Sequence, residues 1–65
     1  MDGNLERAWA LLQQGRHQDA IQFAQQVLSQ DLDNSSAYLV IALSRLGLKE
    51  YAAATDAVEQ ARDRG

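Results

Sequence analysis

The sequence predicts an all-α domain of four helices, and three observations lead to this prediction. The 65-residue chain contains no proline, and it is rich in alanine, leucine, glutamine, glutamate and arginine, all of which favour helices. Its β-branched residues are few and scattered, so the sequence gives strands little support. Apolar residues recur at helical spacing in four segments, which glycines and polar stretches separate. A chain of this length makes one domain with a thin core.

The first two segments, roughly residues 4–14 and 18–30, are predicted to be amphipathic helices. Gly15 follows the first, and the polar stretch of residues 31–36 follows the second. Each segment places its apolar residues at the i, i+3, i+4, i+7 spacing of one helix face. These residues are Leu5, Ala8, Trp9 and Leu12 in the first segment, and Ala20, Ala24, Val27 and Leu28 in the second.

The third segment, residues 36–46, is apolar on nearly every side, so we expect a central helix that is buried on most sides. Asn34 or Ser35 is expected to cap its N-terminus. The fourth segment, residues 49–63, is predicted to be a helix that buries one apolar face. That face consists of Tyr51, Ala54, Val58 and Ala61. Gly15 and Gly47 each follow a predicted helix, where a left-handed residue is commonly glycine.

The chain also repeats itself at an offset of 34 residues. Five pairs are then identical: Leu5 with Leu39, Ala8 with Ala42, Leu12 with Leu46, Ala20 with Ala54, and Gln26 with Gln60. An offset of 32 would align the two glycines, but it would set Ala24 against Asp56 and break the apolar face. We therefore prefer the offset of 34, which pairs the first helix with the third and the second with the fourth.

A 34-residue period of two helices is that of the tetratricopeptide repeat, and this chain resembles two such repeats, residues 1–34 and 35–65. The family's small, large, small spacing in the second helix is present as Ala20–Ala24–Val27 and as Ala54–Val58–Ala61. Residues 15–24 form the closest local match. Asn4 and Arg7 depart from the pattern, since an aromatic and a leucine are usual there. The resemblance implies four antiparallel helices in a short right-handed superhelix.

The resemblance also implies a protein-interaction module, a scaffold or adaptor that binds a peptide or helix on a concave surface lined by the first helix of each repeat. The residues at these places form an apolar groove: Leu5, Trp9, Leu12, Leu39, Leu43, Arg45 and Leu46. For the apolar members, Trp9 included, a core position is the alternative. Arg45 either reaches solvent along its aliphatic stem or pairs with an acidic partner.

The family's carboxylate-clamping members use basic and amide side chains at places that here hold Leu5, Trp9, Ser36 and Val40. None of these side chains can pair with a carboxylate. Recognition of a C-terminal carboxylate of that kind is therefore not expected.

A second function remains open, which is self-association as a homodimer through the same apolar surface. In the family an additional polar-faced helix normally covers the last helix pair, and none follows the fourth segment here. An enzyme is not expected, because the sequence contains no glycine-rich phosphate loop and no nucleophile constellation. Without cysteine, and with His17 as its single histidine, the chain is also expected to bind no metal and no cofactor.

Charge and hydropathy narrow the choice of partner further. The net charge is −3 and no basic stripe is present, so we expect no binding to nucleic acid. The longest apolar run, residues 37–43, is too short to insert across a membrane. No secretory signal is visible, so we expect a cytoplasmic protein.

Overall fold

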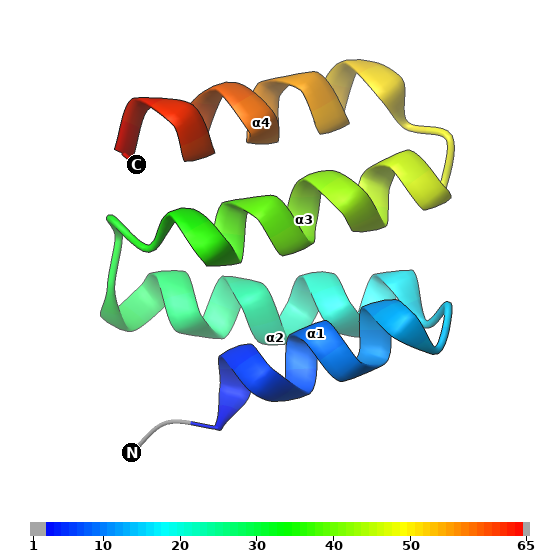
Figure 1. Cartoon of the computed structure of the whole chain (residues 1–65), viewed down its shortest axis with the longest axis horizontal. Coiled ribbons are helices and arrows are strands. Elements are labelled where there is room, and N and C mark those ends of the chain that lie inside the picture. Colours follow the sequence, from blue (N-terminus) through cyan, green and yellow to red (C-terminus); the bar gives the residue numbers. More distant parts are fainter. Residues whose placement is uncertain (1–2, 65) are drawn as a thin grey trace.

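A computed structural model describes residues 3–64, and the ends of the two predicted repeats at residues 1–2 and 65 lie outside that part. The described chain forms four α-helices: α1 (Asn4–Gln13), α2 (His17–Gln30), α3 (Ser35–Gly47) and α4 (Tyr51–Arg64) (Figure 1). It contains no strand within these residues. The predicted all-α class with four helices is thus confirmed.

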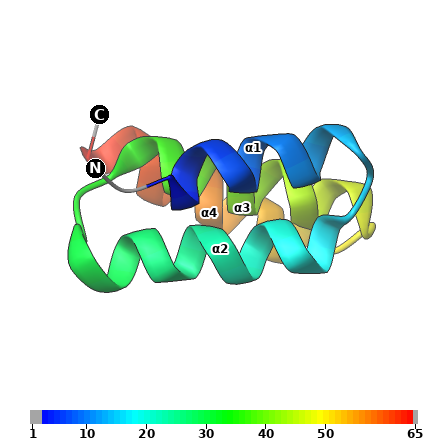
Figure 2. The same cartoon turned by 90° about the horizontal axis from the view of Figure 1, so that it is seen from below.

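Consecutive helices pack side by side with alternating direction. α1 packs on α2, α3 packs on α4, and contacts of α2 and α1 with α3 join the two pairs. Figures 1 and 2 show α1 and α4 at opposite edges of the molecule, with α2 and α3 between them. Among the described helices, α4 contacts α3 alone, so much of its surface has no helix against it.

The two turns that precede α2 and α4 repeat at the predicted offset of 34. In the first, the Arg16 N–H donates to the Leu11 carbonyl at 2.9 Å, and in the second the Glu50 N–H donates to the Arg45 carbonyl at 2.8 Å. Gly15 has a φ of 79°, and the residue 34 positions later, Lys49, has a φ of 64°. α2 and α4 also begin and end 34 residues apart.

The prediction that Gly47 is the left-handed residue after the third helix is wrong, because Gly47 is the last residue of α3 and Lys49 takes that conformation. The structure gives a different reason for the glycine. A Cβ atom at position 47 would overlap the imidazole ring of His17, which lies against the glycine. Gly47 thus allows the start of α2 to approach the end of α3 closely.

The core lies mainly where α1, α2 and α3 meet, and its centre consists of small residues. Ala8, Ala20 and Ala24 are completely buried, in keeping with the predicted apolar faces of the first two helices. Leu11 and Ile21 are also buried, although the predicted faces did not include them. They lie beside those faces, and α1 and α2 bury wider surfaces than one four-residue row because α3 packs against both helices.

The outer half of the domain is less buried than predicted. α3 buries Ala37, Val40 and Ile41, but it exposes a row of three leucines, which we call the leucine row: Leu39, Leu43 and Leu46. α4 buries Ala54, Ala57 and Ala61, but Tyr51 and Val58, which we had predicted to be buried, are exposed. The physical reason is the position of α4 at the edge of the molecule, where it covers one side of α3 and nothing covers its own outer side.

Polar contacts fix the ends of α3 and α4. Asn34 caps α3 as predicted, since its Oδ1 accepts a hydrogen bond from the Ala37 N–H at 3.0 Å. Arg64 holds the last turn of α4 to the α2–α3 turn. Its Nε donates to the Leu32 carbonyl at 3.0 Å, and its guanidinium lies 4.8 Å from the centre of the Tyr38 ring. None of the helices within residues 3–64 has both the length and the apolar character needed to cross a membrane.

Candidate functional site

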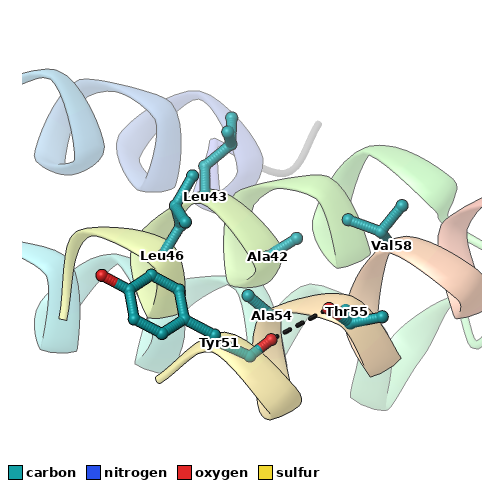
Figure 3. Close-up of a pocket in the computed structure, with 7 residues that line it drawn as sticks. All are labelled: Ala42, Leu43, Leu46, Tyr51, Ala54, Thr55 and Val58. Atoms are coloured by element: carbon teal, nitrogen blue, oxygen red, sulfur yellow. Dashed lines mark hydrogen bonds between the residues drawn. The ribbon is translucent and has the colours of Figure 1, made fainter. Parts of the chain in front are cut away.

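An apolar hollow of about 270 Å³ lies on the exposed side of the second helix pair. Side chains from both helices line it: Ala42, Leu43 and Leu46 of α3, and Tyr51, Ala54, Thr55 and Val58 of α4 (Figure 3). We call it the α3–α4 hollow. Its floor is formed by the two small residues, Ala42 and Ala54, which are almost fully buried where the helices touch. Larger side chains on either side of these alanines form its walls.

The chemistry of the hollow is almost wholly apolar. None of its lining residues is charged. The hydroxyl of Thr55 donates to the carbonyl of Tyr51 within the same helix at 3.0 Å, so its hydrogen is already used (Figure 3). The hollow therefore offers a surface for apolar contact, and it brings together no groups of the kind that perform acid–base or nucleophilic chemistry.

The walls of the hollow remain substantially open to solvent. Leu43 is 42% exposed, Val58 45% and Tyr51 60%. Large apolar side chains that lie together and exposed on a small domain commonly mark a site of interaction.

The residues predicted to form the groove divide into two groups. Leu43 and Leu46 line the α3–α4 hollow, and Leu39 lies in the same leucine row, one turn earlier on α3. Their counterparts in the first repeat are partly buried and pack against the core: Leu5, Trp9 and Leu12. The structure thus places the exposed part of the predicted groove on the second repeat.

Arg45 lies at the end of α3 and pairs within its own chain. Its Nη1 lies 3.0 Å from Oε1 of Glu50, and its side chain is 30% exposed. The contact joins the last turn of α3 to the residue that precedes α4. Arg45 is therefore held beside the hollow, and it is not among the residues that line it.

Tyr51, Thr55 and Val58 line the hollow but were missing from the predicted site. The sequence gave Tyr51 and Val58 a core role, because their helical spacing is the same as that of buried residues. The 34-residue offset offers a signal that could have found them. It pairs Val58 with Ala24, so the second repeat carries a larger apolar residue at a position where the first buries an alanine.

His17 lies far along the chain from the hollow's residues and has a packing role. Its ring rests on Gly47, and its Nδ1 is buried without a hydrogen-bond partner. The family resemblance placed a packing aromatic at this position, and the ring contact is of that kind. Within residues 3–64, no three side chains of the His, Cys, Asp or Glu type gather as a possible metal site.

Comparison of the chain with family models, curated proteins and solved structures finds no match. The resemblance to the tetratricopeptide repeat therefore stays a prediction, which rests on the 34-residue period and the spacing of small residues in α2 and α4.

Proposed function

We propose that this chain is a protein-interaction module, and that it binds a helix or peptide segment of a partner protein by apolar contact. The observation that carries this proposal is the α3–α4 hollow, an apolar depression with exposed leucine, tyrosine and valine walls. A groove of this chemistry suits an amphipathic helix, whose apolar anchors recur on one face every three or four residues.

The same chemistry disfavours a small-molecule or catalytic role. Small-molecule sites contain a few convergent polar groups that fix the orientation of the ligand. In the hollow, the hydroxyl of Thr55 already donates to the carbonyl of Tyr51, and no charged side chain enters the lining. Binding of a partner segment through shape and apolar area is the use that these residues support.

Self-association is the second candidate. A second copy presents the same hollow and the same leucine row, so a two-fold pair could cover both surfaces at once. Sedimentation over a hundredfold concentration range, up to roughly millimolar, tests this candidate directly. A mass that stays monomeric throughout would contradict it and leave the partner-binding role.

Selection from a display library of amphipathic helical peptides tests the partner-binding role. We expect the selected peptides to bind the native protein and to lose binding to the double variant Leu43→Gln, Leu46→Gln. Leu32→Gln is the matched control, because Leu32 is 69% exposed but lies in the α2–α3 turn, outside the hollow. Glutamine is a good helix former, so the change on α3 removes apolar contact without weakening the helix. Peptides that bind all three proteins equally, or a library that gives no binder, would contradict the proposal.

A further inference from the structure

The α3–α4 hollow has a counterpart in the first repeat, and the protein itself fills that counterpart. Subtracting 34 from each lining residue gives a matching set on α1 and α2: Ala8, Trp9, Leu12, His17, Ala20, Ile21 and Ala24. Every member of this set is buried or partly buried. Ala8, Ala20 and Ala24 have no exposed surface at all. The helix that contacts both α1 and α2 on this side is α3.

The face that α3 turns toward the first repeat is narrow and made of small or β-branched residues. Ala37, Val40 and Ser44 are completely buried, and Gly47 lies against the ring of His17 at the start of α2. These four positions follow the spacing i, i+3, i+7, i+10, which is one row along a helix. The leucine row lies on the opposite side of the same helix, and Tyr38 and Arg45 contact residues at the two ends of α4.

We infer that the α3–α4 hollow receives a partner helix whose contact face has the pattern of this row of α3. The inference rests on the proposed function, and it specifies the partner's chemistry. The contact would continue an interface that the fold already contains. The backbone offset of 34 residues brings the same elements together at the same turns. Small and β-branched residues in the partner would allow its helix to approach Ala42 and Ala54 as closely as α3 approaches Ala8 and Ala20.

A second copy of the chain cannot supply such a face from α1, which is the counterpart of α3. The positions that match the α3 row are Gly3, Glu6, Ala10 and Gln13. All four are exposed, and one of them is charged. Docking α1 of another copy into the hollow would bury the Glu6 carboxylate against apolar side chains that offer it no partner.

The test uses the intact protein and a synthetic peptide of residues 34–48. A lactam bridge between positions 39 and 43 holds the peptide helical, and Leu46→Gln keeps it soluble, so all three changes lie on the leucine row and leave the contact row intact. A bridged peptide of residues 3–14, which carries the polar row of α1, is the matched control. Binding is followed by fluorescence anisotropy and by amide shifts of the ¹⁵N-labelled protein.

We expect the first peptide to bind saturably, with the largest shifts at Ala42, Thr55 and Val58. Val40→Asp within the peptide should weaken binding by about tenfold or more, because that change places a charge at the centre of the contact. The control peptide should not bind at concentrations roughly ten times higher. In the protein, Leu43→Gln with Leu46→Gln should weaken binding, whereas Leu32→Gln should leave it unchanged.

Three outcomes would overturn the inference. If peptides of another pattern, selected from the library, bind the hollow and the α3 peptide does not, the inference fails while the proposed function stands. Shifts at Ala8 and Ala20 in place of Val58 would mean that the peptide displaces the protein's own α3. A dimer that the double leucine variant abolishes, and that excludes the peptide, would make a second copy the occupant. If no helical peptide of any pattern binds, the proposed function fails as well.

Discussion

Gly47 and His17 allow a test of the helix contact that joins the two repeats, because the effect of a single methyl group should change sign with its neighbour. Replacing glycine by alanine within a helix normally stabilises it, by about 0.5–1 kcal/mol near a helix end. In this protein the added Cβ would lie within van der Waals overlap of the ring atoms of His17. Forcing extra volume into a packed contact typically costs about 1–3 kcal/mol.

We therefore expect Gly47→Ala to lower the free energy of unfolding by about 1 kcal/mol in the native background. In a His17→Ala background the obstacle is absent, and the same change should raise the free energy of unfolding by about 0.5–1 kcal/mol. The coupling between the two positions is then about 1–3 kcal/mol. The ring has limited freedom to move aside, because its Nδ1 is already buried.

Urea denaturation of the four proteins, followed by far-ultraviolet circular dichroism and by Trp9 fluorescence, measures this cycle. Unchanged m-values would show that the variants unfold by the same transition. Gly47→Ala that stabilises the protein equally in both backgrounds would refute the reasoning, since it would mean that the ring does not rest on position 47.

Three further predictions concern other contacts of the fold. Lys49→Gly should stabilise the protein by about 0.5–1 kcal/mol in urea, because an L-residue in the left-handed region costs about 1–2 kcal/mol and glycine returns part of this through its flexibility when unfolded. Gly15→Ala at the matching position should destabilise it, and changes of the same sign at both sites would contradict the prediction. Ser44→Ala should raise the melting temperature by about 4–8 °C, since the Ser44 hydroxyl is buried without a hydrogen-bond partner and its removal is worth about 1 kcal/mol. Arg64→Ala should lower the free energy of unfolding by about 1–2 kcal/mol, through loss of the Tyr38 stacking and the Leu32 hydrogen bond, while Arg62→Ala on the exposed side of α4 should change it by less than about 0.5 kcal/mol. Equal losses for the two arginine variants would argue against the α4 anchor.

The sequence predicted the number of helices, the 34-residue offset and the Asn34 cap because each depends on local chemistry. Helical spacing, a polar capping side chain and the alternation of apolar with polar residues act within a few positions of the chain. The left-handed residue was misplaced at Gly47, because a glycine near a helix end has two possible causes. One is a positive φ, as at Gly15, and the other is the close approach of a distant side chain, as with His17.

The candidate site was predicted only in part for a related reason. Periodicity identifies an apolar face, but it does not say whether another helix covers that face. Leu12 and Leu46 are identical and stand in the same place in their repeats, yet one packs against the core and the other is about half exposed. The difference arises from the order of packing, because α3 covers the first pair and no described helix covers the second. Such information lies in the tertiary structure and not in either segment alone.

The polar outer row of α1 has a consequence for how copies of the protein meet one another. A repeat that exposed an apolar face at both ends would add to itself end to end without limit and grow into fibres, because a head-to-tail contact that does not close into a ring leaves another free end each time. In this chain, Glu6 and Gln13 line the face that would have to meet the next copy's hollow. One end can thus stay adhesive toward other proteins while the opposite end blocks polymerisation, which gives a small domain an exposed apolar surface without making it a seed for filaments.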